Sequence, residues 1–145
     1  MTLAWHFVRT RRGRPVLRDG RRVIVGKWVE HTGDVKLCER GLHASYCVID
    51  ALDYCDWPNA VACLVEIDDI VAEESDKLVC RRRRVLGVVE ADAVLRIFAR
   101  MQALEVAHLW AMPDVVREFL ETGNEGLRDA AARDARAAAG AAWAA

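Results

Sequence analysis

The residues best suited to chemistry lie together in one short stretch of this 145-residue chain, from Cys38 to Ser45. Gly41 opens a tight bend there, and His43 and Ser45 follow two and four residues later. Tyr54 comes shortly afterwards, in a segment whose pattern predicts a short helix. Imidazole, hydroxyl and thiol groups can hold a ligand, move protons or attack a substrate. The stretch therefore predicts a functional site.

The five cysteines, at positions 38, 47, 55, 63 and 80, raise the possibility of zinc or of a catalytic thiol. Structural zinc sites usually present closely spaced cysteine pairs, and that spacing is absent here. A thiol nucleophile would need His43 beside Cys38 or Cys47, without any supporting motif around them. A triad at Ser45 lacks the Gly-x-Ser-x-Gly turn. We expect no metal, and cysteines that pack as small apolar residues.

The same composition bears on the cellular setting. We expect no secretory leader, since the first residues lack an apolar segment. We also expect no membrane span, because no apolar run approaches the required length. Five cysteines without a leader indicate reduced thiols, so the sequence predicts a cytoplasmic protein.

Charge is distributed unevenly, although the formal net charge is only -1. Residues 1–40 hold ten Lys and Arg against four acids, whereas residues 41–80 hold nine acids against Lys77 alone. Seven arginines surround a predicted hairpin, and Arg81 to Arg84 follow one another on a predicted strand, where they must alternate between two faces. The absence of a recognition helix, zinc finger or aromatic ladder disfavours nucleic acid. The arginines could instead pair with the acidic segment, hold the phosphates of a small ligand, or face a protein partner.

Apolar spacing predicts an α+β fold, with a mixed or antiparallel sheet and short helices followed by a helical C-terminal extension. Predicted strands cover residues 3–8, 16–17, 23–28, 35–38, 61–67 and 78–89, with a turn at Asp19-Gly20 and an acidic loop at 68–76. Predicted helices cover residues 50–56, stopped near Trp57-Pro58, and then 91–112, 113–121 and 125–139. We divide the chain into an α+β domain, residues 1–90, and a helical segment, residues 91–145, that packs on this domain or projects from it.

The turn Gly41-Leu42-His43-Ala44-Ser45, the helix ending in Ala51-Leu52-Asp53-Tyr54 and the apolar strand Ala62-Cys63-Leu64-Val65-Glu66 follow one another in an order that resembles the central motif of ADP-ribosyltransferase-like folds. The resemblance covers roughly residues 4–90. It implies an NAD-binding domain whose turn and helix grip the nicotinamide.

Site residues follow from this resemblance by order along the chain. Gly41, His43, Ser45 and Tyr54 would line the NAD pocket, and Tyr54 would supply the stacking ring. His6 would match the first-strand histidine that holds a ribose. Glu90 would match the late acid of the transfer step and would act in catalysis together with His43. His43 stands where the family usually has tyrosine, and a helical region follows Glu90 directly.

Over nearly its full length the chain is also similar to an uncharacterised family of phage and prophage proteins. Shared features are the Cys-x-x-Gly-Leu-His-Ala core, the Leu-Trp-x-x-Pro helix pair and an Ala/Arg/Trp-rich tail. This resemblance implies an accessory role toward a host system.

Two function hypotheses follow from these resemblances and from the charge pattern. In the first, an ADP-ribosyltransferase-like domain binds NAD and modifies a host target. In the second, a non-catalytic inhibitor of the anti-defence or immunity type binds a host or toxin protein through its charged faces and helical tail. Convergence of His6, His43 and Tyr54 on one open cleft would favour the first hypothesis.

Overall fold

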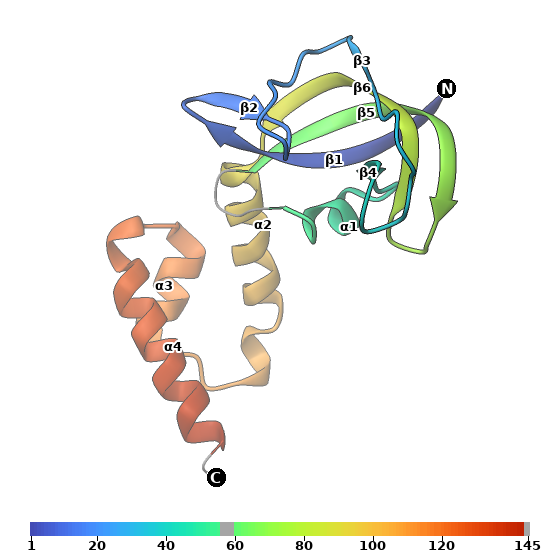
Figure 1. The fold of residues 1–145 in the computed structure, drawn as a ribbon. Helices are drawn as coiled ribbons and strands as arrows, with labels where there is room; N and C mark the ends of the chain where they lie inside the picture. The colour runs from blue at the N-terminus through green and yellow to red at the C-terminus, as the bar shows by residue number, and fades with distance from the viewer. Residues whose placement is uncertain (56–59, 144–145) are drawn as a thin grey trace. The chain divides into compact units, whose positions relative to one another are not determined.

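The computed structural model describes residues 1–55 and 60–143. Its contacts divide the chain into two compact units, Met1–Asp92 and Ala93–Ala145. An antiparallel sheet that curls on itself dominates the first unit, and helices make up the second (Figure 1). The α+β fold predicted from the sequence is confirmed.

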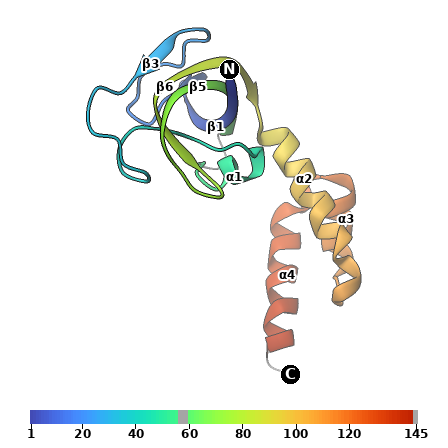
Figure 2. The same cartoon turned by 90° about the vertical axis from the view of Figure 1, so that its right-hand side faces the viewer.

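The sheet has the strand order β2-β1-β5-β6-β3, and β4 pairs with β6 outside this path. Its strands are β1 (Thr2–Arg11), β2 (Arg14–Val16), β3 (Trp28–Glu30), β4 (Leu42–Ala44), β5 (Ala60–Glu73) and β6 (Leu78–Glu90). All of these strand pairs are antiparallel. Register shifts on β5, at Leu64/Val65 and at Ile70/Ala72, bend the sheet. Figure 2 shows β1, β5 and β6 curling around a common interior.

The long β5–β6 hairpin corrects one prediction from the sequence. The acidic segment 68–76 is a loop only from Glu74 onward, because β5 continues to Glu73. Acids on β5 lie opposite arginines on β6 and form ion pairs with them: Asp68 with Arg82 at 2.7 Å, and Glu66 with Arg84 at 2.5 Å. Cross-strand pairs of opposite charge stabilise a sheet, so the acidic residues extend the strand.

The interior of the curl is apolar. Alternate residues of β1, β5 and β6 face it, and the core includes Ala4, Val8, Cys63, Val65 and Cys80. The prediction that cysteines pack in the core therefore holds for Cys63 and Cys80, and it is wrong for Cys38 and Cys47, which are exposed. Cys38 lies in a turn and Cys47 at the start of α1 (Val48–Leu52), and both positions lie outside the interior of the sheet.

Local structure departs from the sequence predictions at a few places. Helix α1 begins two residues before the predicted range, and its predicted stop at Trp57-Pro58 lies outside the described residues. The predicted strand 35–38 is a turn, closed by the Lys36–Arg40 bridge. The turn at Asp19-Gly20 is confirmed, with the Leu17 N–H donating to the Arg21 carbonyl at 2.8 Å.

The second unit contains three α-helices and two short 3₁₀ helices within its described residues. They are α2 (Asp92–Glu105), η1 (Ala107–Leu109), α3 (Asp114–Thr122), η2 (Glu125–Leu127) and α4 (Arg128–Trp143). Helix α3 ends at Thr122 and is followed by Gly123 in the left-handed conformation, and α3 packs against α4. No helix in the described part of the chain combines the length and apolar character that a membrane crossing requires.

Candidate functional site

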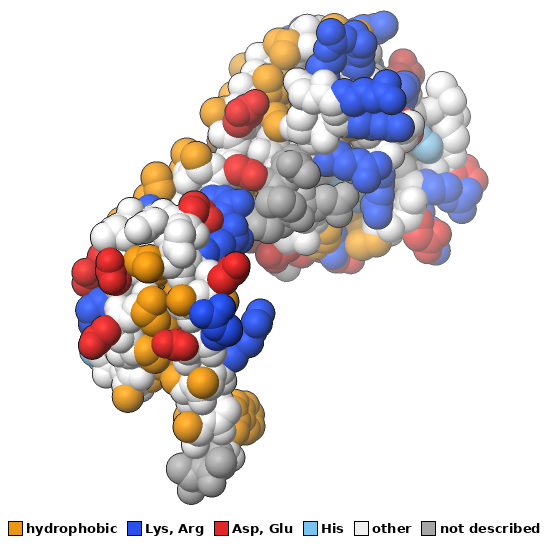
Figure 3. All heavy atoms as spheres, turned by 90° about the vertical axis from the view of Figure 1, so that its left-hand side faces the viewer, with side chains coloured by type: hydrophobic (Ala, Val, Ile, Leu, Met, Phe, Trp, Pro, Cys, Tyr) orange, Lys and Arg blue, Asp and Glu red, His pale blue; other side chains and the backbone are white. Residues whose placement is uncertain are grey.

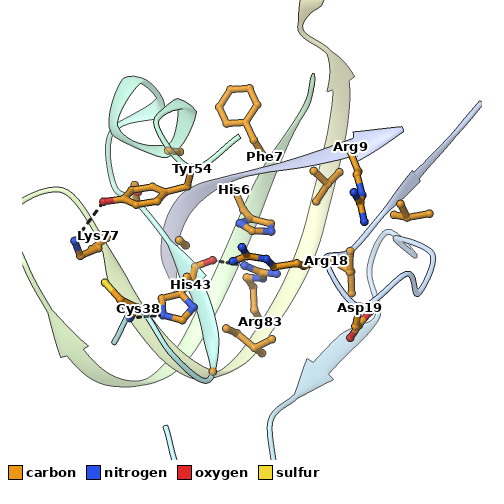
Figure 4. Close-up of a pocket in the computed structure, with 18 of the residues that line it drawn as sticks. His6, Phe7, Arg9, Arg18, Asp19, Cys38, His43, Tyr54, Lys77 and Arg83 are labelled. Carbon is orange, nitrogen blue, oxygen red and sulfur yellow. Dashed lines mark hydrogen bonds between the residues drawn. The ribbon is translucent and has the colours of Figure 1, made fainter. Parts of the chain in front are cut away.

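A pocket of about 740 Å³ opens into the curled sheet. Its walls come from β1, from the turn after β2, from β4 with its preceding loop, from α1 and from β6. The lining includes every residue predicted to bind a cofactor, namely His6, Gly41, His43, Ser45 and Tyr54 (Figure 4). His6, His43 and Tyr54 therefore lie around one open pocket.

Glu90 does not join them. It is the last residue of β6, it is exposed, and it pairs in register with Val61. The pocket lies near the other end of β6, where Leu78 pairs with Ala44 of β4. Seven residues separate Glu90 from Arg83, or roughly 23 Å of extended strand at about 3.3 Å per residue. The order of motifs along a chain does not fix which end of a long strand reaches a site.

The turn before β4 sets the position of His43. Cys38 and Gly41 both have positive φ, 64° and 121°, which folds the chain back sharply. The Cys38 backbone N–H then donates to Nε2 of His43 at 2.9 Å. Nε2 therefore acts as an acceptor, and the neutral ring carries its proton on Nδ1. Partial burial, and then the nearby charge of Arg83, lower the pKa of His43.

His6 reaches the pocket from β1 because it lies on the same face of this strand as the core residues Ala4 and Val8, which point into the curl. It lies opposite Cys63 in register. Burial lowers the pKa of His6 well below its ordinary value, and the charges of Arg83 and His43 act in the same direction. Both pocket histidines are thus neutral at physiological pH.

Arg83 is the most unusual residue of the pocket. Its side chain comes from the middle of β6 and is only 5% exposed. It donates a hydrogen bond to the backbone carbonyl of His43, and no carboxylate within residues 1–55 and 60–143 forms an ion pair with it. Burial lowers the pKa of Arg83 to about 10, so the guanidinium is still charged at neutral pH.

In the sequence, nothing distinguishes Arg83 from its neighbouring arginines as a pocket residue. Alternation along Arg81 to Arg84 was the only available signal, since it requires some of these side chains to point inward. Arg84 is in register with Glu66 and forms an ion pair with it on the other face of the sheet. Arg83 faces the interior.

A second guanidinium reaches the same space. Arg18 is exposed and lies in the turn after β2, and Figure 4 shows it directed toward the centre of the pocket. Its charge helps to lower the pKa of His43. The neighbouring Asp19 does not neutralise it, because Asp19 pairs with Arg21 at 2.6 Å. Two arginines without an ion-pair partner among the described residues therefore face one pocket.

Comparison with known proteins gives the family of the chain. Residues 17–97, more than half of its length, match a sequence family described as a domain of unknown function, DUF7666. The chain belongs to the DUF7666 family. No curated protein and no solved structure matches it.

The DUF7666 range includes most of the pocket but not all of it. Arg18, His43, Tyr54 and Arg83 lie within residues 17–97. His6 precedes this range, on β1. The pocket is thus formed by the DUF7666 domain together with the two strands that come before it, β1 and β2.

Tyr54 lies at the rim of the DUF7666 pocket and is 54% exposed. Its hydroxyl donates to Asp76 and accepts a hydrogen bond from Lys77 at 3.3 Å. The bond to Asp76 raises the pKa of Tyr54. The hydroxyl is held in place while much of the ring stays accessible, so the ring can stack on a flat ligand.

A zinc site and a catalytic thiol, the other two possibilities raised by the cysteines, have weak structural support. No group of three or more His, Cys, Asp or Glu in the described part of the DUF7666 chain is placed to hold a metal ion. Burial raises the pKa of Cys63 and of Cys80 to about 11. These two thiols are therefore protonated and unreactive at neutral pH.

The two pocket histidines predict a pH dependence of stability. Unfolded histidines take up protons near pH 6.5, whereas His6 and His43 resist protonation in the folded chain. The unfolded state therefore binds more protons below pH 6.5, and the free energy of unfolding falls on acidification, by up to about 1.4 kcal/mol per pH unit for each histidine. Urea unfolding from neutral pH to mildly acidic pH would measure this slope. The substitution His6→Gln should flatten it and His108→Gln should not; equal slopes in all three proteins would contradict the assignment.

Proposed function

We propose that the sheet unit binds a small phosphate-bearing molecule in the pocket around Arg83, with NAD as the first candidate. The observation that carries the proposal is a buried, charged guanidinium without a carboxylate partner in the described residues. An isolated buried charge costs several kcal/mol unless an opposite charge compensates it. A phosphate would provide that charge, and its oxygens fit the planar fork of arginine.

Other groups in the pocket support the same class of ligand. Arg18 would provide a second guanidinium for a phosphate or pyrophosphate group. His6 and His43, both neutral, could bond ribose hydroxyls. The accessible ring of Tyr54 would stack on a nicotinamide or a base. A volume of about 740 Å³ lies within the usual range for sites that hold small molecules and cofactors.

The resemblance to ADP-ribosyltransferase-like folds makes NAD the candidate to test first. Under that resemblance, and the one to phage accessory proteins, the bound NAD would be used on a host target. Glu90 lies far along β6 from the pocket, so the proposal assigns it no role in transfer. What the pocket residues support directly is binding of the nucleotide.

The inhibitor hypothesis draws less support. It relies on charged faces, but several arginines of β6 already have acidic partners. Arg81 lies 3.6 Å from Asp69, and Arg82 lies 2.7 Å from Asp68. Charges that pair within the sheet contribute little to recognition of a protein partner.

Thermal unfolding with a matched set of ligands tests the proposal. NAD and ADP should raise the melting temperature, whereas nicotinamide and adenosine at the same millimolar concentration should not. A ligand at 100 times its Kd stabilises the folded state by about 2.7 kcal/mol. His43→Ala should remove the NAD shift, and His31→Ala, a histidine outside the pocket lining, should keep it. An equal shift with adenosine, or no shift with any ligand, would rule out a phosphate-binding pocket.

A further inference from the structure

A second basic surface lies beside the pocket, on the β1–β2 hairpin. A shallow hollow of about 450 Å³ there is lined by Arg11, Arg12, Arg14 and Arg22, together with Val16 and Gly20. We call these four arginines the arginine hairpin. The hairpin side of the sheet unit faces the viewer in Figure 3, where Lys and Arg side chains gather on that face.

The arginine hairpin, like Arg18 and Arg83, has no acidic partner in the described part of the sheet unit. None of its four members forms an ion pair with a residue that the structure describes. Elsewhere in the same unit, Arg21, Lys36, Lys77 and Arg82 all have acidic partners at 3.0 Å or less. The segment itself explains the difference, since residues 9–18 contain five arginines and no acid.

Backbone conformation adds a second observation. Arg12 lies at the tip of the β1–β2 connection with a φ of 51°, in the left-handed region. This conformation costs a non-glycine residue roughly 1–2 kcal/mol. A glycine at this position would remove that cost, so the chain carries a fourth positive charge on this surface at the expense of backbone strain.

The hairpin and the pocket are continuous. Val16 lines both the hollow and the pocket. Arg9, which also lines the pocket, lies opposite Val16 in the sheet register. Arg18 follows two residues after Val16 and points into the pocket. A row of guanidinium groups therefore leads from the hairpin to Arg83.

From this row we infer that the arginine hairpin docks the phosphodiester backbone of a single-stranded nucleic acid, one nucleotide of which enters the pocket. The inference rests on the proposed function, and it adds the class of molecule that carries the phosphate. Arginine is the residue of choice for phosphate recognition, and backbone contacts of this kind need no base-reading motif. The exposed ring of Tyr54 suits base stacking, as in single-strand binding sites.

A protein partner fits the hairpin surface less well. Protein interfaces are usually anchored by aromatic or large apolar side chains in well-packed pockets. The lining of the hollow contains none that is exposed, since Val16 is buried and the exposed Ile24 and Val25 are not part of it. A surface made of arginines alone suits a partner that carries regularly spaced negative charges.

Fluorescence anisotropy with a labelled single-stranded oligonucleotide of about 15 nucleotides tests the inference. The full-length chain should bind it, and the salt dependence should weaken when arginines are removed. For a single strand, each lost phosphate contact lowers the slope of log K against log salt by about 0.7. The double variant Arg11→Ser/Arg14→Ser should lower it by about 1.4 and weaken binding at low salt.

Two further variants exclude a trivial loss of folding. Arg12→Gly removes one charge and the strained φ together, so it should weaken oligonucleotide binding while raising the melting temperature. Arg133→Ser/Arg136→Ser removes two charges from α4 and should leave binding unchanged. Equal weakening by the α4 variant would show that net charge alone drives binding, and would overturn the inference.

Comparing oligonucleotide binding with NAD and ADP binding distinguishes a failure of the hairpin inference from a failure of the proposed function. If NAD or ADP binds but the oligonucleotide does not, the inference fails and the small-molecule pocket stands. If the oligonucleotide binds and no mononucleotide does, the small-molecule proposal fails. A poly-glutamate peptide that binds as tightly as the oligonucleotide, with the same loss in the hairpin variant, would mean that the surface recognises acidic protein and would overturn the inference.

Discussion

Replacing Arg83 by Met should weaken binding of NAD or ADP by roughly 10- to 150-fold, without lowering the free energy of unfolding of the ligand-free chain. A hydrogen bond to a charged group is worth about 1.5–3 kcal/mol, which gives this range at about 1.4 kcal/mol per factor of ten. Methionine has a similar length and fills the space without a charge. The folded chain then loses a buried guanidinium that has no acidic partner among the described residues, and replacing buried charges by apolar groups is often neutral or stabilising.

A matched control lies one residue along the same strand. Arg84 is on the outer face, paired with Glu66 at 2.5 Å. Arg84→Met should leave nucleotide binding intact and lower stability, by about 1–3 kcal/mol, because Glu66 would lose its partner while largely buried. Calorimetric titration and urea unfolding of both variants would show opposite patterns. If Arg83→Met destabilised the chain as much as Arg84→Met and still bound nucleotide, Arg83 would be a structural residue.

The substitution Gly41→Ala should destabilise the sheet unit by at least about 2 kcal/mol. Gly41 has a φ of 121°, which side chains rarely adopt. An added Cβ would also lie 2.6 Å from Cγ2 of Val79 and 2.9 Å from Cγ1 of Val35, both closer than van der Waals contact. Val79 lies on the fully buried part of β6, where little movement is available.

Loss of this turn should also affect the pocket, because Gly41 lies two residues before His43, immediately before β4. Denaturant unfolding gives the stability, and thermal shift with NAD gives the binding. Gly87→Ala on β6 is the control, since an added Cβ there meets nothing within 4 Å and should change stability little. A Gly41→Ala protein as stable as Gly87→Ala would contradict the described turn.

Several of the residues that line the pocket could be picked out from the sequence. The motif from Gly41 to Tyr54 could be read directly because its polar residues lie close together in the chain. His6 was found through the resemblance to a known fold, although it is 37 residues away from His43. His6, His43 and Tyr54 line one pocket, whereas Glu90, predicted from the same order of motifs, does not.

Features that depend on pairing between strands were harder to predict. The acidic segment after Ile67 was expected to form a loop because acids have a low strand propensity, but arginines opposite it on β6 extend the strand. Similarly, the partner of Glu66 is Arg84, which only the strand register reveals. Arg83 can be recognised as a buried arginine only from the strand register, which places it opposite Ile67 and not opposite an acid.

Nuclear magnetic resonance of the arginine side chains tests the central claim most directly. Inorganic pyrophosphate would be titrated into the full-length chain, with the Nε–H signal of Arg83 assigned by its loss in Arg83→Met. We predict a saturable shift of the Arg83 signal, because the anion reaches the buried guanidinium. If the signals of exposed arginines move while that of Arg83 stays unchanged to saturation, the anion does not enter the pocket and the account is wrong.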